Sequence, residues 1–252
     1  MANAAGQEAL RHFRAPNLTA DNKDQQGFDP VTVADRNAER LMRGILARLR
    51  PQDAVLGEEF GHTSGTSGLT WVLDPIDGTR GFISGVPTWG VLISLRDENG
   101  PFFGLIDQPY IGERFVGGFG RASMTGPHGS VKLRTRATGS LEMATLFTTF
   151  PEVGSPQERR AFEALSNRVR LTRYGMDCYA YALLALGQID LVVEAELHPY
   201  DIQAPIAVVQ AAGGVVTDWQ GGAAHEGGRA IAAANSQIHA AALAVLALAE
   251  GN

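Results

Sequence analysis

At positions 73–81 the chain runs Leu73-Asp74-Pro75-Ile76-Asp77-Gly78-Thr79-Arg80-Gly81. Two carboxylates lie three positions apart, a proline fixes the bend between them, and a predicted strand over residues 70–73 comes just before. Adjacent carboxylates repel each other unless a divalent cation lies between them, and hard ions such as Mg²⁺ favour oxygen ligands. Backbone N–H groups around Gly78 and Thr79 are suited to phosphate oxygens. The stretch therefore predicts a metal site joined to an anion site.

Two other interpretations of this stretch have different consequences. The first is purely structural, an Asp-Pro turn followed by an Asp-Gly turn, and for Asp-Gly-Thr alone it would be preferred. The full nine-residue string favours the metal site. The second is a phosphatase with an aspartyl nucleophile, which carries Asp-x-Asp-Gly-Thr with one residue between the carboxylates. Here the residue two before Asp77 is Pro75, so that nucleophile is absent and metal-activated water remains.

Length and composition define the class of protein. A chain of 252 residues corresponds to one large domain or two closely packed halves, and 44% hydrophobic with 19% charged residues is typical of a soluble globular protein. The net charge is −6 and no basic run is present, so neither nucleic acid nor an anionic membrane is an expected partner. Cys178 is the only cysteine, which excludes an intrachain disulfide and favours a reducing compartment. With neither a signal-peptide pattern at the start nor a long apolar run, we expect a cytoplasmic protein.

The first part of the chain predicts two helices with a polar, mobile loop between them at residues 17–29. The first helix is expected over residues 4–13, and the second opens at Thr32 and closes at Arg50. The apolar positions of the second helix at helical spacing are Ala34, Ala38, Leu41, Ile45 and Leu49. Thr32 with Asp35 three residues later resembles a capping box, so helix capping is the structural alternative to a catalytic role for Asp35.

A second acidic group follows a short strand predicted over residues 54–56, in the sequence Gly57-Glu58-Glu59, and a flexible loop is expected over residues 61–68. Paired glutamates usually form a solvated surface patch. The acidic group at Asp74, about 15 residues further on, also lies at a strand end. This second occurrence favours a metal-binding role for Glu58.

The remaining elements predict an antiparallel meander followed by a layered α/β second half. The meander strands are expected at residues 89–95, 102–108 and 114–118. Further strands are expected at 141–148, 169–174, 189–194, 215–217 and 231–234, and helices at 156–167, 178–186, 202–212 and 238–249. We expect two halves, residues 1–135 and 136–252, in one compact unit with the active site between them.

Two acidic residues of the second half are candidates for the same site. Asp201 lies just before a predicted helix, where an N-cap is the structural alternative to a metal ligand. Glu194 ends a strand with an apolar run behind it, so it is expected to face a cleft, the alternative being an ordinary strand-terminal charge. The sequence shows no P-loop, nucleophile elbow or zinc-protease motif. Its six histidines are scattered without ligand spacing.

Four motifs in order resemble the inositol monophosphatase superfamily. They are Asp29-Pro30-Val31-Thr32-Val33-Ala34-Asp35, Gly57-Glu58-Glu59, the string at residues 74–79, and Tyr200-Asp201 before Ala211-Ala212-Gly213-Gly214. Together they cover nearly the whole chain. Within the superfamily, residues 77–85 and 175–181 are most similar to the histidinol-phosphate phosphatase branch. Two departures are that Tyr200 stands where the family usually has Trp, and that the N-terminus is short for the family's first helix.

The resemblance implies an α/β fold, a layered α-β-α-β-α sandwich, a homodimer, and hydrolysis of a small phosphorylated metabolite by water without a covalent intermediate. The implied metal ligands, for two or three Mg²⁺ ions, are Glu58, Asp74, the Ile76 carbonyl, Asp77 and Asp201. The implied catalytic residues are Glu58 together with Asp35 and Thr79, which orient the attacking water. The implied substrate-binding residues are Gly78 and Thr79 for the phosphate, and Arg80, Asp177 and Glu194 for the organic group.

Three functions are compatible with these residues. The preferred one is a histidinol-phosphate phosphatase of histidine biosynthesis. A second is a phosphatase of the same superfamily that acts on inositol 1-phosphate or another sugar phosphate. A third is a metal- or phosphate-binding protein without catalytic activity. The presence of every implied ligand and of both water-orienting residues disfavours the third.

Overall fold

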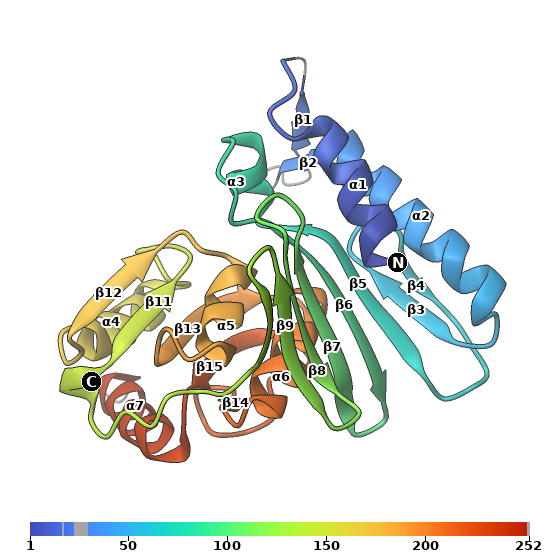
Figure 1. Ribbon diagram of the computed structural model, residues 1–252. Coiled ribbons are helices and arrows are strands. Elements are labelled where there is room, and N and C mark those ends of the chain that lie inside the picture. The colour runs from blue at the N-terminus through green and yellow to red at the C-terminus, as the bar shows by residue number, and fades with distance from the viewer. Residues whose placement is uncertain (17, 23–29, 251–252) are drawn as a thin grey trace.

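The structure, a computed structural model, describes residues 1–16, 18–22 and 30–250. Its elements form five layers, in the order helix, sheet, helix, sheet, helix (Figure 1). The first layer consists of α1 (Ala2–His12) and α2 (Val33–Leu49), which pack on each other and on one face of the larger sheet. This is the layered α-β-α-β-α arrangement that the resemblance implied.

The larger sheet contains the predicted meander and extends beyond it. Its strands are, in spatial order, β10 (Gly129–Lys132), β9 (Arg121–Gly126), β8 (Glu113–Gly118), β7 (Gly100–Gln108), β6 (Gly90–Asp97), β5 (Thr70–Asp77), β3 (Ala54–Gly57) and β4 (Gly61–Thr63). Neighbouring strands are antiparallel except for the parallel pair β3 and β5. The meander is confirmed, whereas β9 and β10 were not predicted.

The smaller sheet belongs to the second half of the chain. Its spatial order is β12 (Leu171–Tyr174), β11 (Thr145–Thr148), β13 (Leu191–Leu197), β15 (Gly228–Ala233) and β14 (Val215–Thr217). Helices α5 (Cys178–Ala185) and α6 (Pro199–Ala211) lie between the two sheets, and α4 (Pro156–Ser166) and α7 (Ser236–Glu250) cover the outer face (Figure 1). The larger sheet falls within residues 1–135 and the smaller within 136–252, although a division at residue 135 stays a prediction.

Helix α6 packs unusually closely on the larger sheet. A Cβ atom at Gly104 of β7 would overlap the carbonyl of Ala204, and one at Gly117 of β8 would overlap the backbone of Ala207. Glycine at these strand positions therefore lets the helix backbone approach the sheet. The core between the sheets is completed by side chains of β6, β7 and β8, namely Leu92, Ile106 and Phe115. Helix α6 also contacts β5, the strand that carries Asp74 and Asp77.

Several predicted boundaries were wrong in ways that matter for the site. The strand predicted over residues 70–73 continues to Asp77, and the helix predicted from residue 202 begins at Pro199. Residues 61–63 of the predicted flexible loop form β4, and a short helix, α3 (Thr79–Ile83), was not predicted. Within the predicted mobile loop, residues 20–22 form β1 (Ala20–Asn22), which pairs with β2 (Pro30–Thr32). Asp29 and most of that loop lie outside the described residues.

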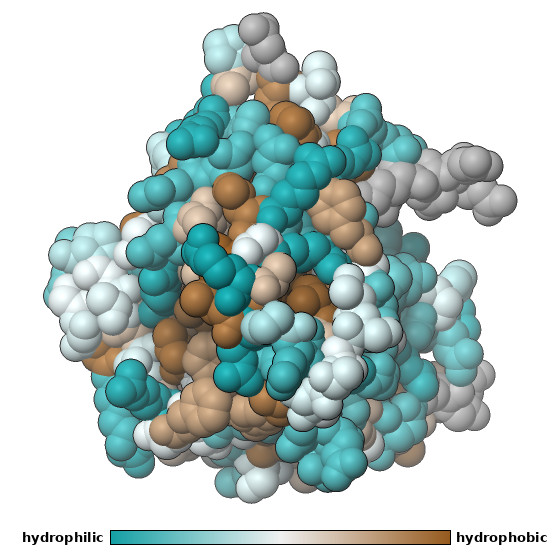
Figure 2. All heavy atoms as spheres, turned by 90° about the vertical axis from the view of Figure 1, so that its right-hand side faces the viewer, coloured by the Kyte–Doolittle hydropathy of each residue, from teal (hydrophilic) through white to brown (hydrophobic). Residues whose placement is uncertain are grey.

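The second helix is confirmed, and Ala34 and Ala38 of its predicted apolar face are buried. Further along, the buried face is rotated from the predicted one, because Leu41 and Leu49 are 43% and 64% exposed whereas Met42 and Leu46 are buried. The face of the molecule on the side of α2 in Figure 1 is mostly hydrophilic, with hydrophobic residues gathered near its middle (Figure 2). The rotation places two acidic residues, Asp35 and Glu39, in the interior.

Among the described residues, no helix combines the length and the apolar character needed to cross a lipid bilayer.

Candidate active site

A bulge at the end of β5 brings two carboxylates to the same side of the strand. Asp74 pairs with Leu92 and Asp77 with Gly90, so β5 advances three residues while β6 advances two. In a regular strand residues three apart point to opposite faces, and one extra residue restores the same face. Pro75 lies at the bulge, where it has no N–H to lose from the ladder. The N–H of Ile76 donates to Asp74 Oδ1 at 3.0 Å.

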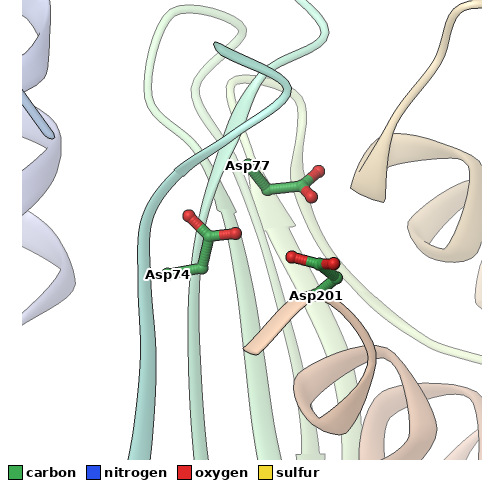
Figure 3. A group of neighbouring side chains, drawn as sticks. All are labelled: Asp74, Asp77 and Asp201. Atoms are coloured by element: carbon green, nitrogen blue, oxygen red, sulfur yellow. The ribbon is translucent and has the colours of Figure 1, made fainter. Parts of the chain in front are cut away.

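A third carboxylate comes from the start of α6. Asp201 is the third residue of that helix, and its Oδ2 accepts the backbone N–H of His198 at 2.7 Å. Asp201 is therefore part of a capping box, not the N-cap that the sequence suggested as an alternative. Asp74, Asp77 and Asp201 offer oxygen atoms that all lie within 4.8 Å of one another. Figure 3 shows the three side chains gathered around one space between β5 and α6.

The charge in this cluster is unfavourable without a cation. Burial raises the pKa of Asp74 well above its usual range, and Glu58, Asp77 and Asp201 raise it further by repulsion. Burial, followed by repulsion from Asp177 and Asp201, raises the pKa of Asp77 to about 8. One compensating contact is the N–H of Cys178, which donates to Asp77 Oδ2 at 2.6 Å. A divalent cation would stabilise the ionised form of all three carboxylates.

Glu58 follows β3, and the loop that carries it is held by α2. Glu39 is fully buried, and its two carboxylate oxygens accept the N–H groups of Glu59 at 2.7 Å and Phe60 at 3.3 Å. Arg43, one turn further along α2, donates to Glu39 Oε1 at 2.6 Å and also binds the carbonyl of Gly61. A Cβ atom at Gly57 would overlap the Glu39 carboxylate. Sequence reasoning missed Glu39, although an acidic residue one turn after Asp35 on the same face was a usable signal.

Asp35 makes the capping contact that the sequence suggested and also faces the site. The N–H and the hydroxyl of Thr32 both donate to Asp35 Oδ2, at 2.8 and 2.6 Å. The other oxygen, Oδ1, lies 3.4 Å from the hydroxyl of Thr79. That hydroxyl also lies 3.0 Å from the carbonyl of Ile76. The capping and site interpretations of Asp35 are thus both compatible with its position.

Two more carboxylates, those of Asp177 and Glu194, line the same cleft as the cluster. Thr149 donates its N–H and its hydroxyl to Glu194 Oε1, at 3.0 and 2.9 Å. Burial nevertheless raises the pKa of Glu194 to about 8, and repulsion from Asp177 adds to the effect. Asp177 has φ 47° and ψ −141°, a sparsely populated backbone conformation that often marks functional sites. Its Oδ2 lies 3.4 Å from the hydroxyl of Thr88.

The candidate phosphate-binding residues follow Asp77 in the chain, and the first of them, Gly78, lies against Asp177. Gly78 has φ 85°, and a Cβ atom there would lie 2.8 Å from Cγ of Asp177, so only glycine fits both the conformation and the space. Thr79 begins α3, and the guanidinium of the exposed Arg80 lies over the ring of Phe150, 4.8 Å from its centroid.

These residues line one cleft of about 460 Å³. Of the residues predicted for the site, only Asp35 is absent from the cleft wall, because it lies behind Thr79. The wall also contains residues that sequence reasoning did not assign to the site, which are Thr149, Phe150, Glu152, Cys178, Tyr181, Ala195, Glu196 and Leu197. Six of these eight follow strand β11 or flank Glu194, so the ends of two adjacent strands would have been the signal. Cys178 and Tyr181 lie in the stretch 175–181 that resembles the histidinol-phosphate phosphatase branch, which was the signal for them.

Comparisons with known proteins agree with this geometry. The sequence profile of the inositol monophosphatase family matches residues 1–249. The chloroplastic bifunctional phosphatase IMPL2 of Arabidopsis thaliana is 39% identical, over 96% of this chain and 72% of that protein. The histidinol-phosphatase of Mycobacterium tuberculosis is 37% identical, over 95% of this chain and 92% of that protein. A solved inositol monophosphatase from Zymomonas mobilis superposes with a TM-score of 0.86 at 39% identity, over 98% and 94% of the two chains.

The family profile and these relatives thus match nearly the full chain. The protein belongs to the inositol monophosphatase family.

Proposed function

We propose that this protein is a Mg²⁺-dependent phosphate monoester hydrolase whose substrate is histidinol phosphate. The observation that carries the proposal is a single cleft lined by two acidic groups. One is the Asp74, Asp77 and Asp201 cluster, suited to cations, and the other is Asp177 and Glu194. The 37% identity to a histidinol-phosphatase supports this choice of substrate.

The donor set fits Mg²⁺. All three clustered groups are carboxylates, Glu58 lines the same cleft, and hard divalent cations prefer such oxygen ligands. The Ile76 carbonyl is the remaining candidate ligand. When bound, the metal lowers the pKa of a water molecule and offsets the charge that develops on the leaving oxygen. The protein would provide the positions of the reacting groups.

Asp35 and Thr79 are proposed to orient the attacking water. The Thr79 hydroxyl has one proton and two acceptors in reach, the Ile76 carbonyl at 3.0 Å and Asp35 Oδ1 at 3.4 Å. The Thr79 hydroxyl can donate to Asp35 Oδ1 while a lone pair of Thr79 Oγ1 accepts a hydrogen bond from a water in the cleft. The proton that the water gives up would pass to Thr79 Oγ1 as Thr79 passes its own proton to Asp35.

The organic end of the cleft favours a cationic substrate. Histidinol phosphate carries an ammonium and an imidazole, whereas inositol 1-phosphate presents neutral hydroxyls. Asp177 and Glu194 would accept charge-assisted hydrogen bonds from the former, roughly twice as strong as neutral ones. Arg80, at the edge of the cleft, adds positive charge near the phosphate without distinguishing the two substrates.

A second candidate, inositol 1-phosphate, has its own support. The Zymomonas mobilis relative of near-identical fold is an inositol monophosphatase. The first proposal also includes a homodimer and a role in histidine biosynthesis.

The test is phosphate release from purified protein with histidinol phosphate, inositol 1-phosphate and p-nitrophenyl phosphate, each with Mg²⁺ and with a chelator. We expect metal-dependent release and the highest kcat/KM for histidinol phosphate. A higher value for inositol 1-phosphate would select the second candidate. No release from any monoester would refute the phosphatase proposal.

A further inference from the structure

Two tyrosines of α5, Tyr179 and Tyr181, have the same chemistry and opposite surroundings. The hydroxyl of Tyr179 donates to Glu113 Oε2 at 2.8 Å. Tyr181 is only 3% exposed, and its hydroxyl has no hydrogen-bond partner within the part of the chain that the structure describes. A buried hydroxyl that has given up water without gaining a partner destabilises the folded protein. Such a group calls for an explanation.

The position of Tyr181 supplies one, because it lines the cleft of the candidate active site. Burial raises the pKa of Tyr181 well above its usual range, and the nearby charge of Glu194, followed by those of Asp77 and Asp201, raises it further. The phenol therefore keeps its proton at any ordinary pH. It is a buried donor on the cleft wall, and the acidic side chains that act on it most strongly are Glu194, Asp77 and Asp201.

We propose that the Tyr181 hydroxyl donates a hydrogen bond to an acceptor on the organic group of the substrate, close to the ester oxygen. The proposal rests on the phosphatase function proposed above. Suitable acceptors are an imidazole nitrogen or a hydroxyl oxygen, so the substrate is an alcohol phosphate that carries such an atom near the ester. Glu194 and Asp177 accept hydrogen bonds, and Tyr181 adds an uncharged donor to the same cleft wall. An uncharged donor there would let the site recognise acceptors as well as cations.

Tyr181→Phe removes this hydroxyl and nothing else. We expect kcat/KM for histidinol phosphate to fall by roughly tenfold, the value of one good hydrogen bond. The Kd of the alcohol product histidinol, measured by calorimetry, should weaken by a similar factor. With p-nitrophenyl phosphate, whose ring has no acceptor near the ester, the loss in kcat/KM should be several-fold smaller. The Tm of the free protein should stay the same or rise, since an unsatisfied buried group is gone.

Tyr179→Phe is the matched control on the same helix. It breaks an existing hydrogen bond outside the cleft, so Tm should fall while kcat/KM stays within twofold of the wild type. A Tyr181→Phe protein with lower Tm and unchanged Kd and kcat/KM would show a structural role and overturn the inference. Equal losses with both monoesters would place the contact on the phosphate and also overturn it. If the wild type itself releases no phosphate, the proposed function fails and the substrate contact fails with it. If the wild type is active and Tyr181→Phe has the same kcat/KM and Kd, only the inference about Tyr181 is refuted.

Discussion

Helices α2 and α6 begin in different halves of the chain and are capped in the same way. In each, the third helical residue is an aspartate whose Oδ2 accepts the N–H of the N-cap, from Thr32 to Asp35 at 2.8 Å and from His198 to Asp201 at 2.7 Å. In each, the side chain also faces the candidate site, toward Thr79 or toward the Asp74 and Asp77 cluster. Capping fixes the position of one oxygen and thereby orients the other. A structural role and a catalytic role are therefore compatible in one side chain.

The two helix starts differ in what surrounds the carboxylate. Asp35 is buried against hydroxyl and amide donors, whereas Asp201 is half-buried among other acids. The residues that follow differ too, because α2 carries the Glu39 and Arg43 pair and α6 carries Gln203, whose Nε2 donates to the carbonyl of His225 at 2.8 Å. The start of α2 is satisfied by the protein alone, and the start of α6 is suited to a bound cation.

The strongest test of this difference is Asp201→Asn. Asparagine keeps the capping acceptor but loses the charge of a metal ligand. We expect metal-dependent phosphate release to fall by roughly a thousandfold or more, since metal assistance is worth several kcal/mol. The Tm of the metal-free protein should stay level or rise, because one repulsive charge has been removed.

A matched control for Asp201→Asn is Asp190→Asn. Asp190 is a fully buried aspartate far from the cleft wall, held by the N–H of Thr145 at 2.8 Å and the hydroxyl of Thr138 at 2.5 Å. This variant should lose stability and keep its kcat. If Asp201→Asn behaved like Asp190→Asn, with lower Tm and normal turnover, the contrast between the two helix starts would be wrong.

Asp35→Asn tests the other helix start. Asparagine caps nearly as well as aspartate, but it cannot receive a proton from water. We expect kcat to fall by about 10²–10⁴-fold, the usual contribution of a general base, with little change in Tm. Steady-state kinetics and thermal unfolding of the same preparation would check both parts. Normal turnover combined with a clear loss of Tm would leave Asp35 with a capping role only.

The start of α6 was predicted three residues late, at residue 202, and Asp201, which was considered as its N-cap, is the third helical residue. The Thr32 and Asp35 capping box of α2 was visible in the sequence, because a cap depends on residues within one turn. The face of α2 was not, because the leucine spacing selected Leu41 and Leu49, and packing against α1 and the sheet instead buries Met42 and Leu46. Helical spacing predicts the buried face of a helix poorly where a second set of apolar residues lies one position along from the first.

The sequence predicted which residues belong to the candidate site, but it did not predict how they are arranged in space. The proximity of Asp74, Asp77 and Asp201 depends on a bulge at Pro75, which changes the side of the strand that Asp77 faces. The hydrogen bond from the Glu59 N–H to Glu39 joins segments 20 residues apart in the chain. The unsatisfied state of the Tyr181 hydroxyl depends on everything around it. Such features follow from packing between distant segments.

Glu39→Gln tests whether α2 positions Glu58 through the loop. The amide has one acceptor oxygen where the carboxylate has two, so Arg43 loses its ion pair and one backbone N–H loses its acceptor. We expect the Mg²⁺ concentration for half-maximal activity to rise roughly ten- to a hundredfold, as for other residues that orient metal ligands. Stability should fall by about 1–3 kcal/mol in urea unfolding.

Arg50→Gln is the control for Glu39→Gln. Arg50 also forms an ion pair near a helix end, with Asp53 at 2.7 Å, but it does not touch the Glu58 loop. It should leave the Mg²⁺ requirement unchanged. An equal Mg²⁺ requirement in Glu39→Gln and wild type would mean that the loop holds its shape without α2.

The smallest expected effect is the pH dependence of stability from Glu194, the carboxylate at the organic end of the cleft. Its pKa is about 8 in the folded protein, chiefly through burial, against an ordinary value of 4.5. Between these values the folded protein holds a proton that the unfolded chain has released, so the free energy of unfolding decreases as pH rises through this window. In chelator-treated protein, the wild type should therefore lose more stability between pH 5 and pH 9 than Glu194→Gln, which has no proton to lose. Urea unfolding at several pH values measures the two slopes, and identical slopes would show that Glu194 is ionised and solvated in the folded state. In that case the organic end of the cleft would resemble the satisfied start of α2, with a carboxylate that needs no cationic partner.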